Sequence, residues 1–303
     1  MSLVLIIPLL LLGLALLFVI AIHLGFRAPR VRERGTPADL RLPFKAVNIP
    51  TRHGRQLRAW LIPSASAEAD RIILLHGWGA NMEMLLPLAL PFHRAGMEVV
   101  LFDARNHGLS DGHGHSSLPR FAEDLHDAID WLKARSGHAR GKLALLGHSI
   151  GAGAVLLTAA QRDDIEAVIA VSVFAHPERV MRRELKRWPL PEWLLRAVLR
   201  YVEWIIGQRF DAIAPIHTVC RVKAPVLLVH GDADRVVPIS DARDLIAACP
   251  RADLDLLTVS GARHASVDRI EQHSPQLLDF LVRHGFRVDV DALSPAAAGS
   301  ATD

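Results

Sequence analysis

Residues 143–153 read Leu-Ala-Leu-Leu-Gly-His-Ser-Ile-Gly-Ala-Gly, and this stretch decides how the rest of the chain is interpreted. Its first four residues predict a short buried strand, and the run after Ser149 predicts a helix. Gly147 and Gly151 flank Ser149 in a Gly-x-Ser-x-Gly pattern, which is typical of a sharp turn that exposes a serine hydroxyl. Glycines suit such a turn because it strains the backbone and leaves no room for side chains. A purely structural turn serine is the alternative.

A serine hydroxyl needs a base that takes its proton and a third group that orients the base. In enzymes built on this turn, the chain order is serine, then an acid, then histidine. Residues 224–230 predict a buried strand that leads into Asp232 and Asp234, and α/β sheets gather their sites at such carboxyl ends. Residues 254–259 predict another strand, and His264 follows it. The chain therefore offers all three groups in the required order.

Residues 45–286 resemble the α/β-hydrolase superfamily through five motifs. These are the serine turn, His76-Gly77-Trp78-Gly79 after the strand 71–75, the turn 103–112 after the strand 99–102, the segment 231–238, and the late His264. The segment 231–238 is similar to the acid loop of the superfamily's esterases, lysophospholipases and related peptidases, whose acid corresponds to Asp234. The alternative acid is Asp232, with the other carboxylate capping the helix that starts near Ser240. The resemblance implies a mostly parallel central sheet flanked by helices.

The resemblance also implies a role for each residue. Ser149 would attack an acyl carbonyl, His264 would pass its proton to the leaving group, and Asp234 would orient the imidazole. The backbone N–H groups of Trp78 and Ile150 would form the oxyanion hole. No cofactor is implied, because these groups suffice for acyl transfer.

The side chains of Trp78 and His148 are expected to contact the substrate, although Trp78 could instead pack on its own loop. A metal site is another interpretation of the histidines near these loops, namely His76, His107, His113, His115 and His148. The sequence contains neither His-Glu-x-x-His nor Cys-x-x-Cys spacing. We therefore expect no metal, and expect these histidines to form hydrogen bonds that shape the loops.

Strands alternate with helical patterns such as 118–134, which favours one α/β-hydrolase domain over 45–288. Between two expected strands the chain makes an excursion at about 174–222, the position that carries a helical lid in the superfamily. Residues 289–303 are rich in small residues and predict a disordered tail.

The expected lid contains an amphipathic helix whose apolar residues follow helical spacing: Leu194, Leu195, Val198, Leu199, Val202, Ile205 and Ile206. Its simplest role is to cover the core. Tryptophans and basic residues suggest contact with an anionic membrane surface as well: Trp188, Trp193, Trp204, Arg182, Arg183, Lys186 and Arg187. A solvated helix face is the alternative explanation of these charges.

Residues 3–22 are an uninterrupted apolar run of 20 residues, about 30 Å long as a helix, which matches a bilayer core. We therefore predict a transmembrane anchor over 1–26. A cleaved signal peptide is disfavoured because no Lys or Arg precedes the run, the run is too long, and no Ala-x-Ala site follows.

The next segment, 27–44, is predicted to be a basic juxtamembrane linker. Its arginines are Arg27, Arg30, Arg32, Arg34 and Arg41. By the positive-inside rule, the four before residue 35 place the catalytic domain on the cytoplasmic side. The two cysteines, Cys220 and Cys249, fit a reducing compartment.

These patterns predict a membrane-anchored serine hydrolase that cleaves carboxylic esters or thioesters through an acyl-enzyme, with lipid-like acyl substrates favoured. The alternative is a serine aminopeptidase or amidase, which needs an acidic patch to hold a substrate amine. The lid offers Glu178, Glu184 and Glu192, but basic residues outnumber them. A non-catalytic binding scaffold is a third interpretation, although all three candidate catalytic residues are present. The net charge of +3, without a stacking motif, predicts no binding of nucleic acid.

Overall fold

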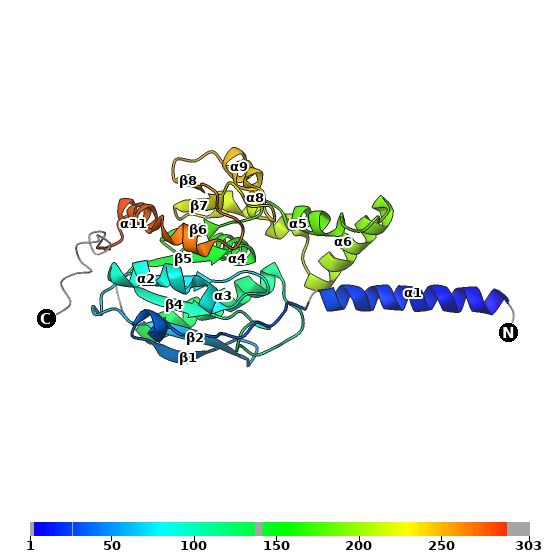
Figure 1. Ribbon diagram of the computed structural model, residues 1–303, viewed down its shortest axis with the longest axis horizontal. Helices are drawn as coiled ribbons and strands as arrows, with labels where there is room; N and C mark the ends of the chain where they lie inside the picture. Colours follow the sequence, from blue (N-terminus) through cyan, green and yellow to red (C-terminus); the bar gives the residue numbers. More distant parts are fainter. Residues whose placement is uncertain (1–2, 26, 137–140, 290–303) are drawn as a thin grey trace.

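The computed structural model describes residues 3–25, 27–136 and 141–289, and it is built around one eight-stranded sheet (Figure 1). The strands lie in the order β1-β2-β4-β3-β5-β6-β7-β8. Their bounds are β1 (Lys45–Pro50), β2 (Gln56–Ile62), β3 (Arg71–Leu75), β4 (Glu98–Phe102), β5 (Leu143–His148), β6 (Ala167–Val171), β7 (Val226–Gly231) and β8 (Leu254–Val259). Among the described strands, β2 alone runs opposite to the other seven, which confirms the predicted mostly parallel sheet. The predicted tail lies outside the described residues, apart from Asp289.

Helices cover both faces of the sheet. The longer ones are α1 (Leu3–Gly25), α2 (Leu86–Arg94), α3 (Leu118–Ser136), α4 (Ile150–Ala159), α5 (Pro177–Leu185), α6 (Glu192–Ile206), α9 (Ile239–Ala248) and α11 (Ser274–Arg283). The short ones are α7 (Phe210–Ile213), α8 (Pro215–Thr218), α10 (Val267–Glu271), η1 (Pro37–Leu40), η2 (Met82–Leu85) and η3 (Val219–Arg221).

Successive side chains of each strand enter opposite cores, because side chains alternate across a sheet. In β3, Ile73 and Leu75 pack with α3, α4 and α9, whereas Ile72 and Leu74 pack with α2, α10 and α11. All five residues of β3 are buried. Burial on both faces explains why the central strands are continuous apolar runs in the sequence.

The excursion predicted at 174–222 is an insertion between β6 and β7 that contains α5, α6, α7, α8 and η3. Helix α6 buries Val198, Leu199 and Val202 on the core side and leaves other side chains exposed. The insertion is attached to the sheet domain by ion pairs from α5 to α9. In these pairs, Arg183 bonds to the buried carboxylate of Asp241, and Arg179 bonds to Asp244 at 2.5 Å.

Helix α1 extends away from the sheet on the side of the molecule where α5 and α6 lie (Figure 1). Its C-terminal end contacts α6, because Nε2 of His23 lies 3.1 Å from the hydroxyl of Tyr201. Among the residues that the structure describes, no helix combines the length and the apolar character that crossing a membrane requires, so the predicted transmembrane anchor is not supported.

The segment between α1 and β1, predicted as a linker, packs against the domain that contains the sheet. Nη2 of Arg30 donates to a carbonyl oxygen in the loop after β4, at 2.5 Å. The N–H groups of Arg34 and Gly35 both donate to the carboxylate of Glu83, at 2.7 and 3.0 Å. We refer to residues 27–36 as the strap, because they bind two separate loops of the domain.

Cys220 and Cys249 form a disulfide that joins η3 to the end of α9. Their Cα atoms are 5.5 Å apart, within the range that a disulfide requires. The sequence had suggested a reducing compartment, whereas disulfides persist in oxidising ones. The pairing was not predictable, because the two residues are brought together by the fold and not by local sequence.

Candidate active site

Ser149 occupies the sharp turn between β5 and α4, with φ 56° and ψ −116°. A positive φ is unfavourable for a residue with a side chain and is often found at functional sites. The two glycines of the motif permit the turn. A Cβ on Gly147 would collide with the carbonyl oxygen of Gly151, and a Cβ on Gly151 would collide with the carbonyl oxygens of Leu75 and His76. The strand-to-helix turn predicted from the sequence is therefore present, and close backbone contacts require its glycines.

The structure brings Ser149, His264 and Asp234 into one hydrogen-bonded chain. Oγ of Ser149 lies 3.0 Å from Nε2 of His264, and Nδ1 of His264 lies 2.7 Å from Oδ2 of Asp234. The other oxygen of Asp234 accepts the N–H groups of Val236 and Val237, both at 2.9 Å. The aspartate is thus held in one orientation by the turn that follows β7.

The second aspartate of the acid loop has a different partner. Oδ1 of Asp232 accepts the N–H of Gly261 at 2.7 Å, which joins the loop after β7 to the loop after β8. Neither aspartate caps α9, whose N-cap residue is Pro238. Of the two acids that the sequence left open, Asp234 is therefore the one that contacts the histidine.

The charge on Asp234 follows from its surroundings. Burial alone would raise the pKa of this carboxyl group. The interaction with His264 and the two backbone N–H donors outweigh burial, and the pKa lies below its usual value. Asp234 is therefore ionised at neutral pH. An ionised acceptor at Nδ1 places the imidazole hydrogen there and leaves the lone pair of Nε2 facing the serine hydroxyl.

The loop that carries Trp78 lies directly against the serine turn. A Cβ on Gly77 would lie 3.3 Å from Cβ of Ser149, so the loop backbone passes close to the hydroxyl. The N–H of Ile150 is the first of α4 and has no partner within that helix. These two segments contain the N–H groups that the sequence predicted for an oxyanion hole.

Two histidines, His76 and His107, form hydrogen bonds that hold this loop, as the sequence predicted. Nε2 of His107 accepts the N–H of Gly79 at 3.1 Å, and Nδ1 donates to the carbonyl of Arg105 at 3.0 Å. His76 likewise accepts from the N–H of Ala104 at 3.0 Å. Burial lowers the pKa of His107, and burial together with His107 lowers the pKa of His76 to about 3. Both rings are therefore neutral and can act as acceptors.

The two side chains expected to contact the substrate lie in different environments. The indole of Trp78 is 37% exposed, and its ring packs edge-on near that of His107. His148 is 3% exposed, and its Nε2 lies 2.6 Å from the carbonyl oxygen of His264. Burial, with the nearby His264, lowers the pKa of His148 to about 4. This position favours a role for His148 in holding the loop of His264, and leaves Trp78 accessible.

Close to the site, the strap places a carboxylate against another carboxylate. Both oxygens of Glu33 are buried next to Asp103, beside Gly108. Asp103 also accepts the N–H groups of Met82 and Leu109, at 2.8 and 2.9 Å. Burial and the neighbouring carboxyl group of Glu33 raise the pKa of Asp103 to about 8. Two buried carboxyl groups this close cannot both be ionised at low cost, so the arrangement is most stable while Asp103 is protonated.

This pair predicts that folding stability falls as pH rises toward about 8. A raised carboxyl pKa gives a stabilising contribution that is complete below the unfolded pKa of about 4 and is lost as pH rises through about 8. We expect Glu33→Gln to flatten the decline of Tm between about pH 5 and pH 8, measured by thermal unfolding. Glu68→Gln, at an exposed glutamate, is the matched control and should leave the decline unchanged. If Tm declined equally with pH in wild type and Glu33→Gln, the proposed effect of Glu33 on the protonation of Asp103 would be wrong.

Among the described residues, one group has the composition of a metal site. His176, Asp211 and His217 place one ligand atom each within 4.8 Å of one another. However, Nδ1 of His176 accepts the N–H of Glu178 at 3.2 Å, so Nε2 carries the hydrogen that points to Asp211, 3.0 Å away. A metal at Nε2 would have to displace this hydrogen and break the cap of α5. The group is therefore explained by its hydrogen bonds.

The sequence pattern of the serine aminopeptidase S33 family matches residues 66–217 and 211–268, which together span more than half of the chain. The chain belongs to this family. Uncharacterized protein YfhR of Escherichia coli K12, a relative, is 29% identical over 252 residues, covering 78% of this chain and 80% of YfhR. Uncharacterized membrane protein YNL320W of Saccharomyces cerevisiae is 24% identical over 255 residues, covering 83% and 84%.

Solved structures agree with the S33 assignment. The esterase Pf2001 of Pyrococcus furiosus matches with a TM-score of 0.70 and 25% identity, over 85% of this chain and 97% of the esterase chain. This similarity confirms the α/β-hydrolase fold predicted from the sequence motifs. The chain is thus a hydrolase of the α/β-hydrolase superfamily.

Proposed function

We propose that this hydrolase cleaves carboxylic esters or thioesters with Ser149 as the nucleophile. The observation that carries the proposal is the hydrogen-bonded chain from Asp234 through His264 to Oγ of Ser149. A serine hydroxyl becomes a useful nucleophile only beside such an oriented base. The strained backbone of Ser149 supports the same assignment, because a merely structural serine would not need this conformation.

The proposed reaction has two halves. In the first, Oγ of Ser149 attacks the acyl carbonyl while Nε2 of His264 takes its proton, and the same proton then goes to the leaving alcohol or thiol. The N–H groups of Trp78 and Ile150 bind the oxyanion of each tetrahedral intermediate. In the second half, water activated by His264 attacks the acyl-enzyme and releases the acid and the free serine. Asp234 keeps the imidazole oriented throughout.

The insertion favours esters over peptides with a free amino terminus. An aminopeptidase needs free carboxylates to bind the substrate ammonium group. The three glutamates that the sequence offered for this purpose have arginine partners: Glu178 with Arg182, Glu184 with Arg187, and Glu192 with Arg182 and Arg196. The description of Pf2001 as an esterase points in the same direction. An aminopeptidase or amidase remains the second candidate, because the family is described by that activity.

We propose that the insertion is a lid and that it favours lipid-like acyl substrates. Three of its tryptophans are exposed, with exposed fractions of 67% for Trp188, 71% for Trp193 and 73% for Trp204. Amphipathic aromatic side chains of this kind are enriched where proteins meet lipid. The arginines beside them contribute less than the sequence suggested, because Arg182 and Arg183 are engaged in ion pairs.

A panel of p-nitrophenyl esters, from acetate to palmitate, tests the proposed function. We expect the rate of hydrolysis to increase with the length of the acyl chain, until the chain exceeds the space beneath the proposed lid. The parallel panel is a set of amino-acid p-nitroanilides, which an aminopeptidase would prefer. Turnover of the anilides without turnover of any ester would replace the esterase proposal by the second candidate.

We also propose that residues 3–22 attach the enzyme to a membrane. Support comes from the uninterrupted apolar sequence, from the exposed leucines Leu9, Leu10, Leu12, Leu16 and Leu17 of α1, and from the description of the yeast relative as a membrane protein. The arginines that follow favour the cytoplasmic side by the positive-inside rule. The Cys220–Cys249 disulfide instead favours an oxidising side of the membrane. Thiol alkylation in intact cells, before and after reduction, distinguishes the two sides.

Fractionation tests the attachment itself. We expect the full chain to stay with membranes after a carbonate wash, and a variant lacking residues 1–26 to be found in the soluble fraction with its esterase activity retained. The strap begins at Arg27, so this deletion leaves its contacts with the domain intact. A full chain that is washed free would refute the attachment, and a truncated chain that stays bound would assign it to the lid.

A further inference from the structure

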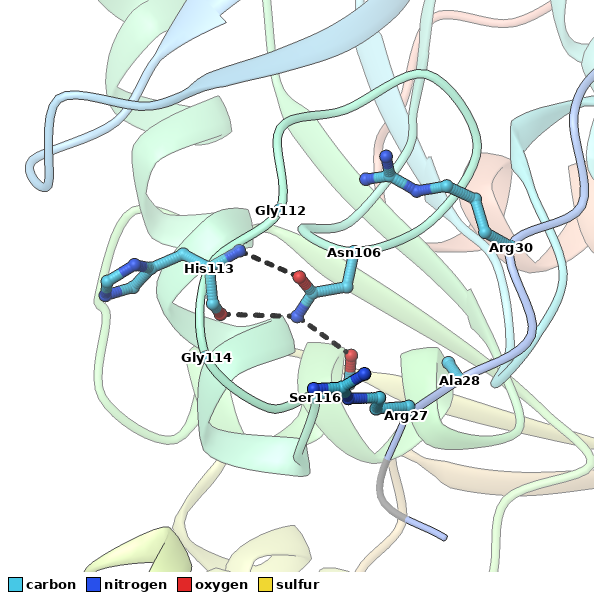
Figure 2. Close-up of a pocket in the computed structure, with 8 residues that line it drawn as sticks. All are labelled: Arg27, Ala28, Arg30, Asn106, Gly112, His113, Gly114 and Ser116. Carbon is cyan, nitrogen blue, oxygen red and sulfur yellow. Dashed lines mark hydrogen bonds between the residues drawn. The ribbon is translucent and has the colours of Figure 1, made fainter. Parts of the chain in front are cut away.

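A cavity of about 440 Å³ lies between the strap and the loop that follows β4, outside the hydrogen-bonded chain of Ser149 (Figure 2). The strap contributes Arg27 and Arg30, and the loop contributes Asn106, His113 and Ser116. Two glycines of the loop, Gly112 and Gly114, complete the wall. The volume is sufficient for a small anionic group with part of its carrier.

The charged side chains that line the cavity are all basic. Arg27 and Arg30 supply two guanidinium groups, and no Asp or Glu lines the cavity. Arg30 is oriented by its bond to the carbonyl of Ser110, at 2.5 Å. Among the described residues, the side chain of Arg27 has no hydrogen-bond or ion-pair partner, so its donors are available to a ligand. Unneutralised guanidinium groups on a concave surface attract and bind anions.

The loop side of the cavity offers a hydroxyl donor. Asn106 has a φ of 66°, accepts the N–H of His113 at 2.8 Å, and donates to Oγ of Ser116 at 3.3 Å (Figure 2). A hydroxyl that accepts a hydrogen bond can still donate its own hydrogen, so Ser116 can act as a donor. Ser116 is 1% exposed, so this donor is fixed within the loop and not freely solvated.

We propose that this cavity binds a phosphate monoester group, with Arg27 and Arg30 as its charged ligands and Ser116 as a neutral donor. Planar guanidinium groups match the geometry of phosphate oxygens and can bind them in pairs. A phosphate monoester carries up to two negative charges, equal to the two arginine charges of the lining. The phosphate comes either from a soluble compound or from a lipid headgroup. The lipid source is consistent with the position of Arg27, two residues beyond the end of α1.

The first experiment uses the full chain and inorganic phosphate. We expect phosphate to raise Tm relative to chloride at equal ionic strength, with saturation, and we expect Arg27→Gln with Arg30→Gln to weaken binding about tenfold or more, measured by calorimetry. Arg27→Gln alone should weaken binding without loss of the Ser110 contact. Arg243→Gln, at an exposed arginine of α9, is the matched control and should bind phosphate as the wild type does.

The second experiment distinguishes the two sources of phosphate. Flotation with phosphatidylcholine vesicles, with and without phosphatidic acid, measures the additional binding due to the phosphate monoester headgroup. Arginine-dependent binding of inorganic phosphate, without additional binding to vesicles that contain phosphatidic acid, identifies a soluble ligand. Arginine-dependent additional binding to those vesicles identifies the lipid headgroup. If the double variant binds both probes as tightly as the wild type, or if the wild type binds neither, the proposal is wrong.

Discussion

Ser149→Ala is expected to abolish ester hydrolysis, with kcat reduced by about 10⁶ and the folded state unchanged. The reason is that no other described hydroxyl lies beside the lone pair of His264, 3.0 Å from Oγ of Ser149. Alanine is also smaller than serine, and the turn already accommodates a Cβ at this position. The measurement is kcat on the best p-nitrophenyl ester, together with Tm to confirm folding.

A fluorophosphonate probe provides an independent reading of the same prediction, because it labels activated serines covalently. The wild type should be labelled with one equivalent, whereas Ser149→Ala should not be labelled. Ser260→Ala, at an exposed serine, is the matched control and should react as the wild type does. Full esterase activity in Ser149→Ala would refute the proposed nucleophile.

Asp234→Asn should reduce kcat by about 10⁴, the second largest effect that we expect. An amide at this position can donate to Nδ1 of His264, which would move the imidazole hydrogen to Nε2 and leave no base facing the serine. Asp232→Asn is the matched control, two residues away in the same loop. Because Asp232 only accepts the N–H of Gly261, we expect this variant to lose less than about tenfold.

The pair of variants is informative because the two carboxylates lie in the same loop and have different partners. A large loss in Asp232→Asn with near-normal activity in Asp234→Asn would show that the acid was wrongly assigned. A pH profile sharpens the test. The proposed loss is in the orientation of the imidazole, so the kcat of Asp234→Asn should recover in part at high pH, where hydroxide can replace the base.

The sequence predicted the parts of the molecule that local patterns determine. The strands around Ser149 and before Asp234 are apolar because both of their faces are buried, so their positions could be predicted. The choice between Asp232 and Asp234 required the structure. Both follow the same strand, and only the fold decides which carboxylate meets the loop that carries His264.

Long-range contacts of polar groups were not predictable. Glu33 belongs to a segment that reads as a charged linker, yet its carboxylate is buried beside Asp103. The acceptor role of His107 toward Gly79 depends on two loops that are 28 residues apart in the chain. Such contacts leave no periodic pattern, because each involves a single side chain and a single partner.

The strap also limits how far the hydrolase domain can move from α1. Arg30, the first strap residue bonded to the domain, lies five positions after Gly25, the end of the helix, and five extended residues reach at most about 17 Å. So short a connection keeps the domain close to α1 at all times. With α1 held in a membrane, as proposed, it would search for substrates in two dimensions, where the local concentration of a lipid ester is far higher than in bulk water.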